Sequence, residues 1–145
     1  MSSRTIPNEI LFASAGALLR EGKDVTIKVK GSSMTPFLRD GRDSVVLRRS
    51  DDFGIGDIVL VQFGTERFVM HRIVSVEGEV FTMMGDGNVR GCERFRRKDV
   101  LGKVIRVIRA DGQEKKPGKA RVWRALKPAR RYLLAIYRRV EKVLG

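Results

Sequence analysis

Short segments in which apolar and polar residues alternate fill the first three quarters of the chain. In the clearest, residues 24–30, Val25, Ile27 and Val29 are separated by polar residues, which is the period-2 pattern of a half-buried strand. Further apolar-rich segments lie at 44–49, 57–62, 67–76, 80–84 and 101–109, with turn-forming residues between them. This spacing predicts a mainly β fold, a compact coiled domain of about seven to nine short strands, and not a doubly wound α/β fold.

A helix is predicted at each end of the chain. Pro7, Asn8 and Glu9 precede an apolar run and are typical of a helix start, so the first helix is expected at 7–21. Near the C-terminus, apolar residues recur at alternating spacings of four and three, and Pro128 is expected to kink or divide this second helix. These apolar residues are Val122, Leu126, Ala129, Leu133, Ile136, Val140 and Val143.

The pattern divides the chain into four parts. They are an N-terminal helix at 1–23, a β domain at 24–113, a polar linker at 114–120 and a basic amphipathic helix at 121–145. The apolar run of the first helix, Ile10 to Leu19, is shorter than the roughly 20 residues that span a bilayer. A cleavable secretory signal is the alternative for this run, but the polar residues on either side favour a packed amphipathic helix.

The basic character of the protein is concentrated at its C-terminal end. The net charge is +13, and from Lys115 onward eleven lysines and arginines stand against one acid, Glu141. The rest of the chain holds nineteen basic and sixteen acidic residues and is nearly balanced. Cys92 is the only cysteine, so neither an internal disulfide nor a zinc-binding cysteine cluster is expected, which fits a reducing, cytoplasmic location. No metal or other cofactor is expected.

Two residues are candidates for nucleophilic catalysis. A serine nucleophile needs a base within hydrogen-bond reach, and the only histidine is His71, on a predicted strand. Ser33 directly follows another predicted strand, in a loop that can present its hydroxyl to solvent. From the residues alone, a structural histidine and an ordinary polar turn remain the alternatives.

Five segments resemble, in the same order and spacing, the signal peptidase/LexA superfamily of serine peptidases. They cover roughly residues 25–108: an S-M-x-P box at 31–38, strand segments at 41–47 and 56–61, a second catalytic box at 69–74 and a G-D-x-N box within 81–88. The resemblance implies a LexA/signal peptidase-like coiled β domain that hydrolyses peptide bonds. Because His71 stands where many members carry lysine, the chain is similar to the Ser/His branch, the archaeal and endoplasmic-reticulum type. An imidazole can act as a base near neutral pH without burial, whereas a lysine must first be desolvated.

The resemblance also implies roles for individual residues. Ser33 would be the nucleophile, His71 its base, and Asp86 the residue that orients His71, with a turn-forming aspartate as the alternative for Asp86. Backbone groups of Gly31, Ser32 and Ser33 would bind the oxyanion. Substrate-pocket candidates, for which buried packing is the alternative role, are Met34, Pro36 and Phe37.

The chain departs from the family pattern in three ways. The Ser/His branch usually has a second aspartate shortly after the G-D-x-N box, but residues 89–93 contain only Glu93 as an acid. Gly31 stands where many signal peptidases have an oxyanion-binding serine. No membrane-spanning anchor is expected, so the chain is predicted to be a member of the superfamily that lacks such an anchor.

The basic C-terminal helix suggests a second partner besides a peptide or protein substrate. Apolar side chains on one face and cations around it are typical of a helix that lies on an anionic membrane, which would make the protein peripheral on that membrane. The expected contact residues are Trp123, Arg130, Arg131, Arg138 and Arg139. Packing on its own domain or on a second copy is an equal alternative. Nucleic acid is less favoured, because no recognised binding motif is present.

Two rivals to the peptidase function remain. One is a catalytically silent peptide-binding module of the same fold, and the other is a basic membrane- or nucleic-acid-associated protein that uses the β domain as a scaffold.

Overall fold

The computed structural model describes residues 8–30, 33–34, 36–65, 67–88, 91–120, 124–125 and 129–144. Helix α1 (Asn8–Arg20) comes first and helix α3 (Arg130–Leu144) comes last, with a 3-10 turn, η1 (Arg97–Asp99), between two of the strands. The strands within the described residues are β1 (Val25–Lys28), β2 (Ser44–Arg48), β3 (Ile58–Phe63), β4 (Arg67–Glu77), β5 (Val80–Met84), β6 (Glu93–Arg96), β7 (Val100–Ile108) and β8 (Glu114–Lys115). The predicted mainly β fold with a helix at each end is confirmed.

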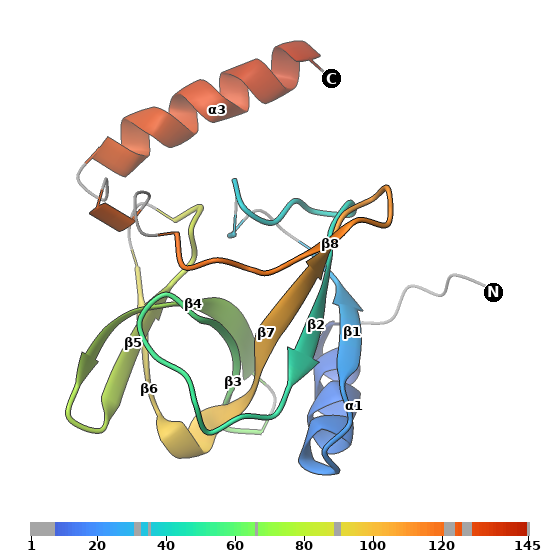
Figure 1. The fold of residues 1–145 in the computed structure, drawn as a ribbon. Helices are drawn as coiled ribbons and strands as arrows, with labels where there is room; N and C mark the ends of the chain where they lie inside the picture. Colours follow the sequence, from blue (N-terminus) through green and yellow to red (C-terminus); the bar gives the residue numbers. More distant parts are fainter. Residues whose placement is uncertain are drawn as a thin grey trace.

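All strand pairs in the sheet are antiparallel. The strand order is β1-β2-β7-β3-β4-β5-β6, with β8 added to β7. Strand β7 therefore joins β2, which belongs to the N-terminal half of the sheet, to β3, the first strand of the meander β3 to β6. The sheet curls strongly upon itself (Figure 1), so that its two faces enclose separate cores.

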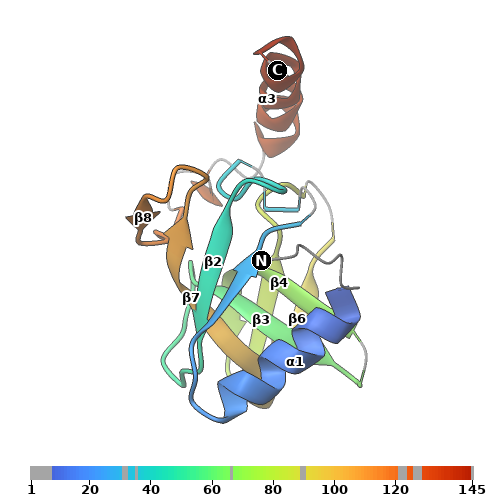
Figure 2. The ribbon, with the colours of Figure 1, turned by 90° about the vertical axis from the view of Figure 1, so that its right-hand side faces the viewer.

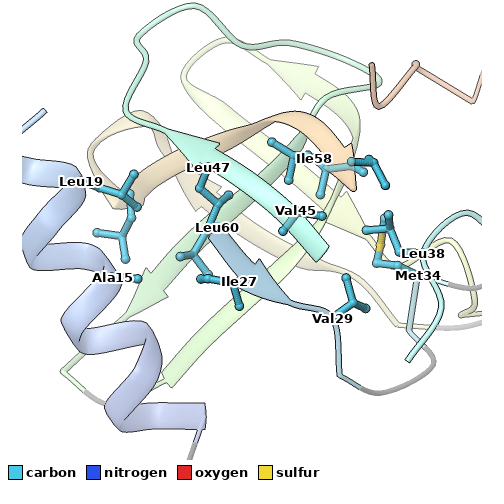
Figure 3. Packing of buried hydrophobic residues seen from close by; sticks show 13 residues of the cluster. Ala15, Leu19, Ile27, Val29, Met34, Leu38, Val45, Leu47, Ile58 and Leu60 are labelled. Carbon is cyan, nitrogen blue, oxygen red and sulfur yellow. The ribbon is translucent and has the colours of Figure 1, made fainter. Parts of the chain in front are cut away.

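Strand β3 contributes to both cores because successive side chains point to opposite faces of a sheet. Ile58 and Leu60 belong to the first core, whereas Val59 and Val61 belong to the second. The first core is largely aliphatic and is covered by α1 through Ala15 and Leu19 (Figure 3). The second is rich in aromatic rings, from Phe53, Phe81 and Phe95. The uninterrupted apolar run of β3 is thus explained by burial on both sides.

Two strands were not predicted from the sequence. In β6, Phe95 is the only apolar residue among charged neighbours, and it alone turns into the second core. Strand β8 lies inside the predicted linker, where Glu114 and Lys115 pair with Ile108 and Val107 of β7. The segment that connects the β domain to the last helix therefore begins as part of the sheet.

The two helices lie at opposite ends of the molecule (Figures 1 and 2). Helix α1 packs against β1, β4 and β7, while α3 stands clear of the sheet on the side of the loops that follow β1 and β5. The predicted kink at Pro128 lies outside the described residues.

Candidate active site

A cavity of about 310 Å³ opens between strands β1 and β4. Ser33, His71 and Glu93 line it together. Strand β1 and the loop after it provide one wall, residues 67–71 of β4 provide the other, and Phe12 of α1 also lines the cavity. The structure thus brings the two predicted catalytic residues into one cavity, with a carboxylate that was not assigned a role from the sequence.

The carboxylate beside His71 belongs to Glu93. Its Oε1 lies 2.7 Å from Nδ1 of His71, and the histidine side chain is largely buried. An ionised carboxylate can only accept hydrogen bonds, so this contact requires the proton on Nδ1. In a neutral imidazole the other nitrogen, Nε2, is then left with a lone pair.

Gly85 packs between the backbone of Ser33 and the Nε2 side of the His71 ring. A Cβ atom at Gly85 would lie 3.1 Å from Nε2 of His71 and would overlap the carbonyl oxygen of Ser33. The same carbonyl accepts a hydrogen bond of 2.7 Å from the backbone N–H of Gly87. The G-D-x-N turn therefore holds the backbone of Ser33 next to Nε2, and glycine at 85 is required for this close approach.

Asp86 has a different partner from the one predicted. Its carboxylate accepts hydrogen bonds from Nε and Nη2 of Arg72, at 2.8 to 3.1 Å, and both side chains are almost completely buried. The prediction that Asp86 orients His71 is therefore wrong. His71 and Arg72 are adjacent on β4 and point to opposite faces, so the side chain that reaches Asp86 is that of Arg72, while Glu93 at the start of β6 reaches His71.

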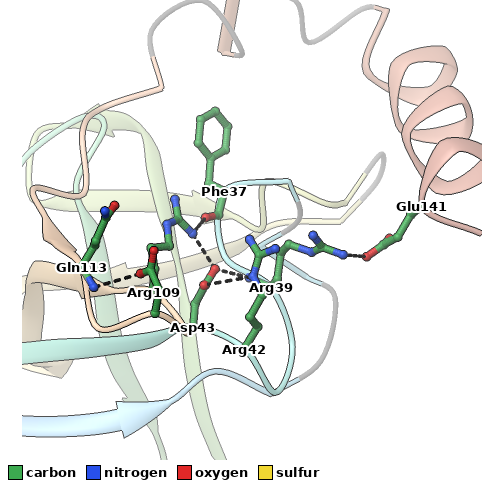
Figure 4. Close-up of polar contacts among 8 residues, drawn as sticks. Phe37, Arg39, Arg42, Asp43, Arg109, Gln113 and Glu141 are labelled. Carbon is green, nitrogen blue, oxygen red and sulfur yellow. Dashed lines mark hydrogen bonds and ion pairs between the residues drawn. The ribbon is translucent and has the colours of Figure 1, made fainter. Parts of the chain in front are cut away.

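The loop that follows Ser33 is fixed by buried polar contacts (Figure 4). The carboxylate of Asp43 is fully buried and accepts hydrogen bonds from the backbone N–H of Arg39, at 2.9 Å, and from the side chain of Arg109. Arg109 also donates to the carbonyl oxygen of Phe37, at 3.0 Å. Met34 and Leu38 anchor the same loop in the first core. The loop is thereby tied to Arg109, which directly follows β7, and to Asp43, which directly precedes β2.

The predicted pocket residues fall into two groups. Met34 lines the cavity but is mostly buried in the core, whereas Pro36 and Phe37 do not line it. The ring of Phe37 instead lies under the guanidinium group of Arg72, 5.3 Å from ring centroid to Cζ. Gly31 and Ser32, predicted to help bind the oxyanion, lie outside the described residues.

Glu93 is the functional candidate that sequence reasoning missed. The sequence signal was present, because Glu93 is the only acid at 89–93, where the Ser/His branch is expected to carry a further aspartate. A glutamate was taken as a departure from the pattern. Its longer side chain and its position at the first residue of β6 allow it to reach Nδ1 of His71.

Comparison with known proteins agrees with this architecture. The family model described as Peptidase S24-like matches residues 4–105, and the chain belongs to this family, within the LexA/signal peptidase-like superfamily of serine peptidases. The match extends from the N-terminal helix into β7, so β8 and α3 lie beyond it. A search of curated proteins found no match.

Two further properties concern ligands and membranes. Within the described residues, no three or more His, Cys, Asp or Glu side chains come together in a group that could bind a metal ion. No helix in that part of the chain combines the length and the apolar character needed to cross a membrane.

Proposed function

We propose that the protein is a serine endopeptidase in which Ser33 is the nucleophile, His71 the general base and Glu93 the residue that orients His71. The observation that supports this most directly is the 2.7 Å contact between Glu93 and Nδ1 of His71. It leaves the lone pair of Nε2 on the side where Gly85 and the backbone of Ser33 lie. Family membership supports the same chemistry.

The proposed reaction proceeds in two halves. The hydroxyl oxygen of Ser33 attacks the carbonyl carbon of the scissile peptide bond while Nε2 of His71 takes the hydroxyl proton. The tetrahedral intermediate then collapses, the C–N bond breaks, and Nε2 gives its proton to the leaving amine. Water, deprotonated by the same nitrogen, then attacks the resulting ester. The second tetrahedral intermediate collapses, the bond to the Ser33 oxygen breaks, and Nε2 returns its proton to that oxygen as the carboxylic acid is released. Throughout, Glu93 accepts a hydrogen bond from Nδ1 and stabilises the transient imidazolium.

The substrate would bind as an extended strand between β1 and β4. Among the described residues, β1 is the terminal strand of the sheet and residues 67–71 of β4 pair only with β3, because pairing with β5 begins at Arg72. Both walls of the cavity therefore present strand edges, which can form backbone hydrogen bonds with an added peptide. This mode of binding would carry the scissile bond along the groove to Ser33.

The charge of the groove favours acidic side chains in the substrate. Lys28, Lys30 and Arg67 line the cavity and are exposed, and the described residues place no acidic partner on any of them. Glu93, the acid among the described lining residues, is engaged with His71. A peptide with aspartate or glutamate beside its apolar positions would therefore gain electrostatic complementarity.

Covalent labelling tests the proposed nucleophile. The full-length protein would be treated with a broad serine-hydrolase phosphonate and its intact mass measured, for the wild type, Ser33→Ala, His71→Ala and the matched control Ser75→Ala. Ser75 lies on the same strand as His71 but does not line the cavity. We expect an adduct on the wild type and Ser75→Ala, and none on the other two variants.

A peptide library analysed for new termini by mass spectrometry completes the test. Cleavage by the wild type that Ser33→Ala abolishes would support the peptidase, and enrichment of acidic residues near the cleaved bond, reduced in Lys28→Glu but not in Lys23→Glu, would support the substrate class. A folded wild type that neither labels nor cleaves would overturn the proposal in favour of the silent peptide-binding module.

A further inference from the structure

Helix α3 has two different faces, and one of them is fixed to the β domain. Leu134 is 1% exposed, Arg138 donates a hydrogen bond of 3.3 Å to the carbonyl oxygen of Gly87, and Glu141 pairs with Arg39 at 2.6 Å (Figure 4). The hydrogen bond with Glu141 also raises the pKa of Arg39 above its ordinary value. These contacts define an inner face that rests on the loops following β1 and β5.

The outer face carries large apolar side chains that are largely exposed to solvent. Tyr132, Ile136 and Val140, four residues apart and therefore on one side of the helix, are 67%, 60% and 49% exposed. Ile136 and Val140 belong to the apolar stripe predicted from the sequence, whereas the buried Leu134 does not. These two residues of the predicted stripe thus point away from the domain, and exposed apolar side chains gathered on one helix face mark an interaction surface.

The charges beside this stripe select its partner. Arg139 and Lys142 are exposed, while the one acid of the basic segment, Glu141, is already paired with Arg39. Two copies of the helix packed stripe to stripe would bring cations together without compensating acids, which disfavours self-association. Nucleic acid would pair with the cations but would leave the apolar stripe in water. An anionic lipid surface satisfies both groups, because apolar side chains enter the acyl boundary while cations meet phosphates.

We propose that the outer face of α3 docks on an anionic membrane surface. Tyr132, Ile136 and Val140 would insert at the level of the headgroups, where tyrosine is favoured by its apolar ring and polar hydroxyl. Because the inner face holds Gly87, whose N–H binds the carbonyl of Ser33, docking would keep the loops around Ser33 close to the membrane.

Vesicle binding by the full-length protein tests this surface. Co-sedimentation would compare vesicles of phosphatidylcholine alone with vesicles of phosphatidylcholine and phosphatidylglycerol. Four proteins would be measured: the wild type, Ile136→Ser/Val140→Ser, Arg139→Gln/Lys142→Gln, and the control Ile55→Ser/Val76→Ser, which removes exposed apolar residues elsewhere. Because all substitutions are at exposed positions, circular dichroism should show unchanged folding.

The wild type and control should bind the anionic vesicles and be released by salt. Loss of the two cations should weaken binding about thirtyfold, and loss of the two apolar side chains should weaken it at least tenfold. Equal partitioning to both vesicle types, or binding that neither double variant reduces, would overturn the proposal. A concentration-dependent dimer in light scattering, abolished by Ile136→Ser/Val140→Ser without any vesicle binding, would overturn it in favour of a second copy as the partner.

Discussion

His71 and Arg72 are neighbours on strand β4, yet they lie in two very different surroundings. Each contacts a carboxylate that follows β5: Glu93 for His71 and Asp86 for Arg72. Arg72 is fully buried and its guanidinium also donates to the carbonyl oxygens of Gly56 and Gly118, at 2.8 and 3.0 Å. Among the described residues, the ring of His71 has one hydrogen-bond partner, Glu93, and its Nε2 lies on the side of Gly85.

The difference is one of burial: the Arg72–Asp86 pair lies inside the domain, whereas the His71–Glu93 pair lines the cavity. A buried guanidinium must have its donors satisfied, so the Arg72–Asp86 pair joins β4, the G-D-x-N turn and the segment before α3 into a closed network. A histidine with one committed nitrogen and one available nitrogen can instead exchange a proton. The first pair should therefore affect stability most, and the second should affect activity most.

The largest loss of stability is expected from Asp86→Ala. Removing the carboxylate leaves Arg72 charged and buried, which costs about 3–5 kcal/mol in the free energy of unfolding. Urea denaturation measures this, with Asp51→Ala, at an exposed position, as a control that should change the same quantity by less than about 0.5 kcal/mol. If Asp86→Ala destabilises the protein no more than Asp51→Ala does, the buried pair does not stabilise the network.

Gly85→Ala should affect both stability and activity, because it inserts a methyl group between Ser33 and His71. Forcing an extra carbon into a packed site costs about 1–3 kcal/mol, and the displaced backbone should abolish phosphonate labelling of Ser33. The matched variant is Gly54→Ala, where a Cβ meets nothing within 4 Å, and it should leave both stability and labelling unchanged. Normal labelling of Gly85→Ala would contradict the close packing around Nε2.

Glu93→Gln should lower activity much more than stability. The amide can accept a hydrogen bond but cannot stabilise the imidazolium, so peptide cleavage should fall by about 10²-fold or more, while stability changes by about 1 kcal/mol or less. The exposed Glu79→Gln is the control, and Glu93→Asp should retain part of the activity. If Glu93→Gln destabilises the protein as much as Asp86→Ala does, the His71–Glu93 pair also serves mainly to stabilise the fold.

The smallest effect is expected at an exposed pair, Asp24 and Arg48, where Arg48 donates two hydrogen bonds of 2.8 and 2.9 Å. These hydrogen bonds lower the pKa of Asp24 below its ordinary value of 3.8. Because the pKa is lower in the folded state, the pair contributes stability above pH 3.8 and loses it as the pH falls below that value. Asp24→Asn should therefore be slightly less stable than the wild type at neutral pH and equally stable in strong acid, as measured by thermal unfolding at both pH values. If the stability difference between Asp24→Asn and the wild type persists in strong acid, it does not come from the ionised carboxylate of Asp24.

Much of the fold was predictable because strand period and turn chemistry are local signals. Residues 24–30 were recognised from alternation, residues 80–84 as an apolar-rich segment next to turn-forming residues, and the helix at α1 from its starting residues. Strand β6 was missed because Phe95 alone faces a core. The partner of His71 was missed for a different reason: which carboxylate reaches it depends on how the turn after β5 folds back, and this is a property of the three-dimensional structure. Which face of α3 rests on the domain likewise depends on the residues that surround Leu134 in space.

The position of β7 has a consequence for the order in which the molecule can form. Strands β1 and β2 can pair early, and β3 to β6 can form a meander, but β7, at residues 100–108, is the strand that joins these two units. During synthesis, the strand edges of both units stay unpaired until β7 emerges from the ribosome. Contacts of such long sequence separation slow folding, and exposed strand edges promote aggregation in the meantime. The closing step of folding is therefore the insertion of one late strand, which makes β7 the segment where substitutions should most reduce the yield of folded protein.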